Sequence, residues 1–184
     1  MQKWENQEPI KCLATNSTQY AINKRINPVG IMIHSSGVKT PYLKTYVQPS
    51  KSDSKYDILM SLIGYNFNNN DWNHIHRSYN YHYFIGLLNN NDIAIVETHP
   101  VDMQVWNDNY IHLCICEKDD DPAYAAEVLL KLQLFCKDIC NEYNWDSSHI
   151  IDCSEYYPFR PDASCWLSQY GYNIRDIKTL CGDC

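Results

Sequence analysis

YHYFIGLLNNNDIAIVE, residues 81–97, contains two runs rich in aromatic and β-branched residues that flank three asparagines. Asparagine tolerates a positive φ, so residues 89–91 predict a hairpin between strands at 81–88 and 92–97. The next apolar run, YIHLCICE at residues 110–117, has the same composition and predicts a further strand. These three runs place a β-sheet at the centre of the fold.

Outward from this segment, the apolar run at residues 30–34 (GIMIH) and the short run at 149–152 (HIID) predict two more buried strands. Asp121 and Pro122 are typical of a helix start, and the apolar residues after them recur with a helical period up to about residue 143. Shorter helices are expected at 56–65 and 174–180, with irregular chain at 1–28, 38–54, 66–80 and 153–163. The order predicts one α/β domain over residues 1–184, with a core at about 20–180 and a central mixed β-sheet flanked by helices.

The composition excludes several classes of protein. The 184 residues carry a net charge of -7, which disfavours nucleic acid as a partner. No apolar run is long enough for an ordinary transmembrane helix, and the first ten residues contain no apolar segment of a signal peptide. We therefore expect a cytoplasmic protein without a membrane segment. Nine cysteines cannot all pair internally, and most are expected to be reduced, buried thiols.

Polar side chains follow the apolar strands at three places. His34 ends the first strand, Cys153 follows the strand at 149–152, and Asp162 and Cys165 come in the next loop. Histidine, cysteine and aspartate are all zinc ligands, and three of them with a water form a hydrolytic centre. Spacing alone makes this a weak prediction, because most buried cysteines are inert. His82 and His112 are expected to be packed core histidines.

Four segments give the chain a specific resemblance to a known family. They are NKRINPVGIMIHSSG at 23–37, YHYFI at 81–85, IIDCSE at 150–155 and RPDASCW at 160–166. In order and spacing, over about residues 20–180, the chain resembles the zinc-dependent N-acetylmuramoyl-L-alanine amidases. This family includes phage endolysins and is related to the peptidoglycan recognition proteins.

The resemblance implies a role for each matching residue. It places zinc on His34, Cys153 and either Asp162 or Cys165. It makes Tyr81 the residue that stabilises the oxyanion, with Arg160 assisting, and it puts Ser35 and Trp106 at the substrate. The implied reaction is cleavage of the bond between N-acetylmuramic acid and L-alanine in peptidoglycan or a muropeptide. The implied origin is a phage or prophage, with access to the cell wall on lysis.

The chain differs from the family at the positions of the zinc ligands and the catalytic residue. Cys153 stands where the family has its second zinc histidine, and Arg160 stands where it has a catalytic lysine or histidine. A thiolate and a carboxylate on zinc would make the metal a poorer Lewis acid. Arginine stays protonated and is a poor proton donor. An alternative is therefore a weakened or inactive amidase-fold protein that binds a muropeptide, another small ligand or a protein partner. A third hypothesis is a cysteine hydrolase with Cys153 as nucleophile and His34 or His82 as base.

Overall fold

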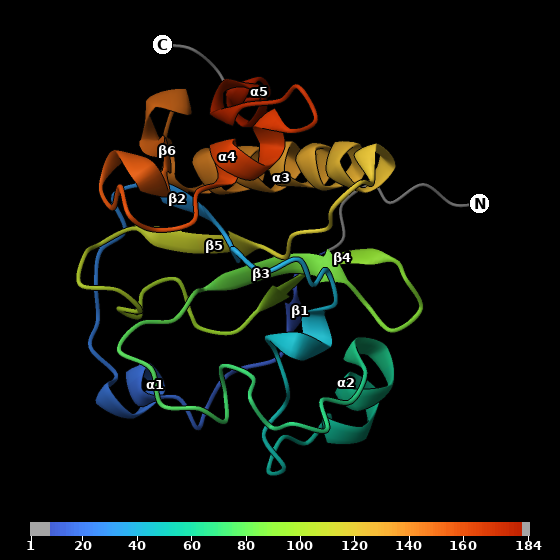
Figure 1. The fold of residues 1–184 in the computed structure, drawn as a ribbon. Coiled ribbons are helices and arrows are strands. Elements are labelled where there is room, and N and C mark those ends of the chain that lie inside the picture. Colours follow the sequence, from blue (N-terminus) through green and yellow to red (C-terminus); the bar gives the residue numbers. More distant parts are fainter. Residues whose placement is uncertain (1–7, 182–184) are drawn as a thin grey trace.

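The computed structural model describes residues 8–181 and contains a six-stranded sheet with the strand order β1-β4-β3-β5-β2-β6 (Figure 1). Only the hairpin pair β3 and β4 is antiparallel, and every other neighbouring pair is parallel. The predicted α/β fold with a central mixed sheet is confirmed. The strands are β1 (Ile10–Lys11), β2 (Ile31–Ser35), β3 (Tyr83–Leu87), β4 (Ile93–Glu97), β5 (Ile111–Ile115) and β6 (Ile150–Asp152).

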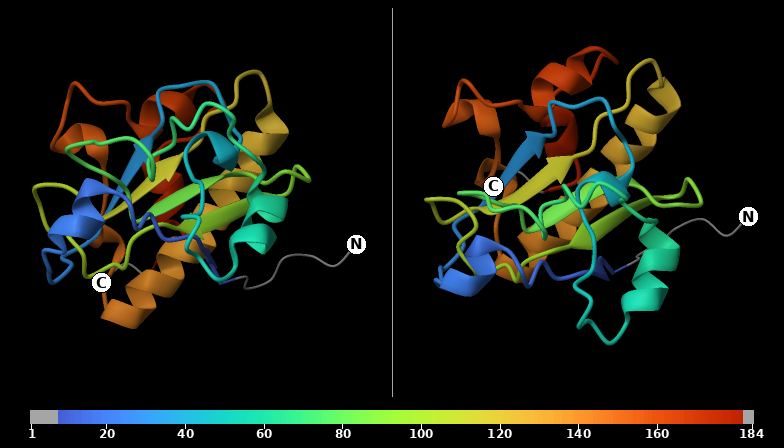
Figure 2. Two further views of the ribbon diagram at one scale, coloured as in Figure 1. Left: turned by 90° about the horizontal axis from the view of Figure 1, so that it is seen from below. Right: turned by 60° about the horizontal axis from the view of Figure 1, so that its bottom comes forward.

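Helices cover both faces of the sheet (Figures 1 and 2). On one face lie α3 (Pro122–Tyr143), α4 (Ala163–Ser168) and α5 (Ile174–Lys178), and on the other lie α1 (Thr18–Ile22) and α2 (Tyr56–Ile63). Three short 3-10 turns complete the fold: η1 (Leu43–Thr45), η2 (Ser147–His149) and η3 (Cys153–Glu155). None of the described helices combines the length and apolar character needed to cross a membrane.

The long helix α3 begins and ends where its sequence predicts. The Asp121 side chain accepts a hydrogen bond from the Tyr124 amide at 2.9 Å, and Pro122 occupies the first helical position. Asn144 ends the helix in the left-handed conformation, with φ at 55°. Because these caps satisfy the free backbone groups, the helix can present one apolar side to the sheet over its whole length.

Short elements differ from the expectation. Strand β1 and helix α1 lie in the segment 1–28, and α4 begins at Ala163, the last residue of the loop expected at 153–163, which also contains η3. These elements have two to six residues, too few to show a periodic pattern. Strand β1 pairs with β4, so the sheet extends upstream of residue 20. The residues Met1 to Gln7, part of the segment without an apolar run, lie outside the described residues.

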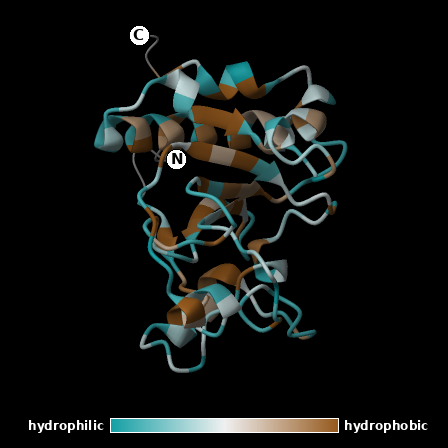
Figure 3. Cartoon of the chain, turned by 90° about the vertical axis from the view of Figure 1, so that its left-hand side faces the viewer, coloured by the Kyte–Doolittle hydropathy of each residue, from teal (hydrophilic) through white to brown (hydrophobic). Residues whose placement is uncertain are grey.

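The core has two layers, one on each face of the sheet. Ile31 and Ile33 pack with α3, α4 and α5, whereas Met32 and His34 point to the opposite face. Figure 3 shows the central strands as the most hydrophobic part of the chain, surrounded by hydrophilic loops. Seven of the eight described cysteines are free and buried, as predicted for inert thiols, and Cys165 is exposed. The alternation of side chains along β2 therefore places His34 on the face away from the long helix.

Candidate functional site

His34 lies at the end of β2 and is almost completely buried. Its ring contacts the rings of Tyr81 and Trp106, with 5.0 Å between centroids in each pair. Its Nε2 atom lies 2.8 Å from Nδ1 of His112 on the neighbouring strand β5. Burial, together with His112 and the Arg160 guanidinium, lowers the pKa of His34 well below its ordinary value. The imidazole is therefore neutral at pH 7.

A chain of hydrogen bonds fixes the tautomer of His34. Asp108 accepts from Nε2 of His112 at 2.7 Å and from the Tyr157 hydroxyl at 2.8 Å. Since the carboxylate holds the proton on Nε2 of His112, Nδ1 of that ring accepts from Nε2–H of His34. The remaining nitrogen of His34, Nδ1, is then the unprotonated one.

Asp108 is ionised in this arrangement. Burial by itself raises the pKa of Asp108, but hydrogen bonds from His112, the Tyr110 amide and the Tyr157 hydroxyl outweigh burial and lower it. Burial lowers the pKa of His112, and Asp108 opposes this change. The sequence contained no pattern that pointed to Asp108, because its partners come from β5 and from the turn after β6.

The backbone brings three of the predicted zinc ligands close together. His34 and Asp162 form an isolated antiparallel bridge, and Cys153 lies in η3, directly after β6, the parallel neighbour of β2. The side chains are engaged elsewhere. Asp162 caps α4, where its carboxylate accepts from the Cys165 amide at 2.5 Å. Cys165 is exposed.

The arrangement does not fit a zinc ion. Over residues 8–181, no three or more His, Cys, Asp or Glu side chains are grouped so that they could hold a metal ion. Nε2 of His34 is bonded to His112, which leaves Nδ1 as the ring nitrogen that could bind a metal. Burial, with Asp152 and Asp162 nearby, raises the pKa of the Cys153 thiol to about 12. This raised pKa belongs to the site without a metal, because zinc itself deprotonates a thiol that it binds. The metal site stays a prediction from the resemblance.

The same high pKa disfavours the cysteine hydrolase. A catalytic cysteine needs a lowered pKa and a base within hydrogen-bond reach. Of the two suggested bases, His82 is fully buried, and its ring nitrogens face the Met103 carbonyl and the His112 amide at 2.8 and 2.9 Å. His82 and His112 are thus hydrogen-bonded core histidines, as the sequence predicted.

The predicted catalytic and substrate residues surround His34. Tyr81 is buried beside the imidazole, and burial raises the pKa of its hydroxyl well above the ordinary value. Trp106 stacks on His112 at 5.3 Å and also contacts the Tyr157 ring. The Arg160 guanidinium lies over the Tyr79 ring at 4.7 Å, and its Nη1 donates to the Tyr79 hydroxyl at 3.1 Å.

A pocket of about 160 Å³ opens beside these residues. Ser35 and Cys114 lie in its wall, from the ends of β2 and β5. Its other walls include aromatic rings and two arginines, from Tyr46, Trp72, Arg77, Tyr79, Tyr81 and Arg160. Sequence analysis missed the contribution of the loop at 66–80, because its many asparagines are typical of a solvated loop. Trp72 and Tyr79 inside that polar loop were the available clue.

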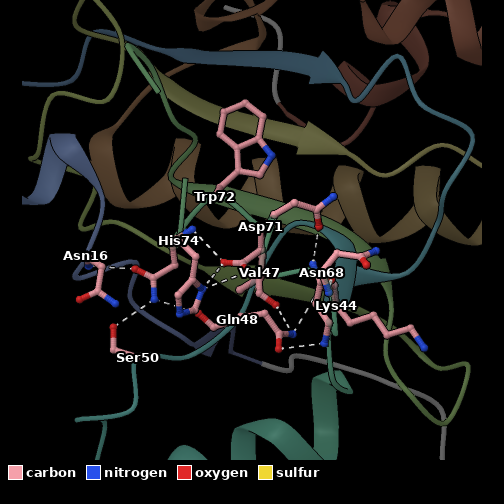
Figure 4. A network of polar contacts seen from close by, with 12 residues as sticks. Asn16, Lys44, Val47, Gln48, Ser50, Asn68, Asp71, Trp72 and His74 are labelled. Atoms are coloured by element: carbon pink, nitrogen blue, oxygen red, sulfur yellow. Dashed lines mark hydrogen bonds and ion pairs between the residues drawn. The ribbon is translucent and has the colours of Figure 1, made fainter. Parts of the chain in front are cut away.

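A buried polar network holds this loop in place (Figure 4). The Asp71 side chain is fully buried and accepts from the His74 ring at 2.9 Å and the Asn73 amide at 3.0 Å. Asn73 in turn donates to the Gln48 carbonyl at 3.0 Å. In Figure 4 the Trp72 ring points away from these polar groups, toward the strands. The network therefore fixes the backbone that presents Trp72 to the pocket.

Comparison with solved structures finds chains that share this fold. The catalytic domain of XlyA superposes with a TM-score of 0.57 at 12% identity, over 93% of this chain and 99% of that one. A mutant endolysin from Bacillus subtilis gives 0.57 at 15% identity, over 95% and 99%. A mutant of PlyL gives 0.53 at 14% identity, over 94% and 99%. No family model matches the sequence, and no curated protein does. The chain has the fold of the catalytic domain of XlyA and of this endolysin.

Proposed function

We propose that the chain binds a peptidoglycan fragment, a muropeptide, in the pocket beside His34. The observation that carries the proposal is the lining of this pocket by aromatic rings and arginines, on the fold of an endolysin. Tyrosine, tryptophan and arginine are the side chains that dominate recognition sites, because they combine a large apolar surface with polar groups. The pocket is small, so it would hold one sugar or one residue of the peptide stem, with the remainder of the ligand across its rim.

Binding without turnover is favoured over hydrolysis by the state of the polar side chains. His34 is neutral and bonded to His112, and the Asp162 carboxylate caps a helix. The Tyr81 and Cys153 side chains both have raised pKa values, so each is held protonated at pH 7. A protonated tyrosine can donate a hydrogen bond to a ligand carbonyl, but neither Tyr81 nor Cys153 can act as a general base while it is protonated.

The first test is binding of N-acetylmuramoyl-L-alanyl-D-isoglutamine, measured by titration calorimetry, with mass spectrometry of the mixture after prolonged incubation. We expect saturable binding and no cleaved product. Replacing Trp72 by alanine removes one aromatic wall and is expected to weaken binding about tenfold or more. The matched control is Phe67→Ala, whose ring is 84% exposed and is not part of the pocket wall. Absence of binding at millimolar ligand would contradict the proposal.

A second candidate function is zinc-dependent cleavage of the bond between N-acetylmuramic acid and L-alanine. The backbone bridge between His34 and Asp162, with Cys153 on the adjoining turn, is the observation that favours it. His34 could bind zinc through Nδ1, its unprotonated ring nitrogen, while Nε2 keeps its bond to His112, whereas one oxygen of the Asp162 carboxylate caps α4.

Zinc content separates the two candidates. The binding proposal predicts substoichiometric zinc in protein purified without chelator or a histidine tag, as measured by elemental analysis. One zinc per chain that disappears in His34→Ala, together with release of L-alanyl peptides, would establish the hydrolase in its place. The control is His76→Ala, because the His76 side chain is exposed and lies outside the site.

A further inference from the structure

We infer that the pocket holds an anionic group, a carboxylate or a phosphate, between the guanidinium groups of Arg77 and Arg160. The inference rests on the proposed function only for the location of the ligand, and it specifies the chemistry that the ligand must carry. The chain as a whole has a net charge of -7. Two of its four arginines nevertheless line this one pocket, and none of the residues in the wall is acidic. The charge of the pocket is thus opposite to that of the protein.

Neither arginine is neutralised within the described part of the chain. Arg25 forms an ion pair with Asp102 at 2.6 Å, but Arg77 and Arg160 form none within 4.0 Å of a carboxylate. The Nε–H group of Arg77 is buried and has no hydrogen-bond partner among the described residues. Buried donors in native proteins are nearly always paired, so an unpaired one calls for an explanation. An oxyanion from a ligand supplies the missing acceptor.

Aromatic rings hold both guanidinium groups in position. The Arg77 group lies 4.2 Å from the centroid of Trp72, and the Arg160 group lies 4.7 Å from that of Tyr79 and 5.6 Å from that of Trp106. Stacking engages the flat face of a guanidinium and leaves its edge, which carries the N–H donors, available to an oxyanion, apart from the Nη1 donor of Arg160 that is bonded to the Tyr79 hydroxyl. Because the rings fix the side chains beforehand, little rotamer entropy is lost when an anion binds. Arginine pairs with carboxylates and phosphates through two parallel N–H···O bonds, which adds specificity.

Two kinds of ligand carry such an anionic group, and the test distinguishes between them. The free carboxylate of a peptide stem is one, and a phosphate monoester is the other. The probes are N-acetylmuramoyl-L-alanyl-D-isoglutamine, the same compound with its carboxylate converted to the carboxamide, phenyl phosphate, and inorganic phosphate alone. Each is titrated against the full chain at low and at raised salt, because ion pairs at a partly open site weaken with ionic strength.

On the wild-type chain, we expect either that the muropeptide acid binds at least tenfold more tightly than its carboxamide, or that phenyl phosphate binds and the binding weakens at raised salt. The single variants Arg77→Gln and Arg160→Gln should each weaken anion binding about tenfold, and the double variant should abolish the preference for the charged form. Arg77→Lys and Arg160→Lys keep the positive charge but lose the pair of parallel N–H donors. Their affinities for the anion should therefore lie between those of the wild type and of the glutamine variants. The matched control is Arg175→Gln, on the exposed side of α5, which should bind as the wild type does.

Equal binding of the acid and the carboxamide by the wild-type chain, without binding of phenyl phosphate or inorganic phosphate, would overturn the inference, and this comparison needs no variant to fold. Unchanged anion binding in the double variant would overturn it as well. If the muropeptide binds without dependence on its carboxylate and neither phosphate probe binds, the inference fails and the proposed function stands. If phenyl phosphate binds through both arginines while no muropeptide binds, the inference stands and the proposed function fails.

Discussion

Acidification below pH 6.5 is expected to unfold the protein steeply. Burial lowers the pKa of His34, His82 and His112, and it lowers the pKa of His99 to about 4. These rings stay neutral in the folded chain but take up protons once unfolded, where the pKa of histidine is about 6.5. Stability is therefore complete above pH 6.5 and is lost as the pH falls from there toward 4.

The expected size follows from proton linkage. Each histidine that is protonated only in the unfolded state removes about 1.4 kcal/mol of unfolding free energy per pH unit. Four of them together remove about 5 kcal/mol per unit, against a total stability of about 5–15 kcal/mol for a typical domain. Urea unfolding at pH 7.5, 6.5, 5.5 and 4.5 measures the slope directly. The midpoint of acid unfolding should lie between pH 4 and 6.

A single variant tests whether buried histidines cause the loss of stability at low pH. His99 is held by the Tyr81 carbonyl at 3.0 Å and the Ser17 hydroxyl at 2.9 Å. His99→Asn keeps a donor near the Tyr81 carbonyl but cannot titrate in this range. Its unfolding free energy should therefore be lower at pH 7.5 but should fall by about 1.4 kcal/mol per unit less than that of the wild type. A wild-type stability that does not change between pH 7.5 and 5 would refute the explanation.

Replacing Asp152 by alanine is expected to cost about 3–5 kcal/mol, because it leaves four donors without their acceptor at a buried position. One carboxylate oxygen accepts from the amide and the hydroxyl of Ser154, both at 3.0 Å. The other accepts from the amide and the hydroxyl of Ser164, at 2.9 and 2.7 Å. The side chain thus ties η3 to α4, the two ends of the segment that carries Arg160. Ligand binding should weaken together with stability.

The control for Asp152→Ala is the same substitution at Asp121, another aspartate at the start of a helix. Asp121 caps α3 through a hydrogen bond from the Tyr124 amide, forms an ion pair with Lys118 at 2.7 Å and is only partly buried, so Asp121→Ala should cost about 1–2 kcal/mol. Asp152→Asn keeps the shape but only one accepting oxygen, and it should lose less stability than Asp152→Ala. Thermal and chemical unfolding of the three variants gives the loss of unfolding free energy for each. If Asp152→Ala costs no more than Asp121→Ala, the carboxylate does not tie the two turns together.

The main elements of the fold could be predicted because they are periodic or have recognisable ends. The hairpin of β3 and β4 and the helix from Asp121 to Asn144 belong to this group. The helix expected at 56–65 is present as α2, but only some of its apolar residues face the core: Leu59 and Ile63 are buried, whereas Ile58 is 62% exposed. Two adjacent apolar residues per turn do not reveal which of the two faces the core.

The site was harder to predict because its parts meet only in three dimensions. Polar residues at strand ends pointed to His34, since rigid strands place their ends reliably, whereas Arg160 was expected from the family resemblance alone. The same argument could not show that His34 is bonded to His112 and that Asp162 is a helix cap. A side chain's partner depends on the register of neighbouring strands, and β2 and β5 are far apart in the sequence.

The position of β2 in the sheet also determines the order in which the chain can fold. Ile31 pairs with Ile111 on one side and with Ile150 on the other, so both neighbours of β2 are made long after β2 itself. The hairpin closes locally, but pairings this distant in sequence are slow, because a long loop must be ordered first. During synthesis, β2 therefore emerges with both edges unpaired, and the pocket can close only when β6 and α4 have left the ribosome. Until then the growing chain has a partly formed sheet and an exposed apolar strand, which makes it a substrate for chaperones.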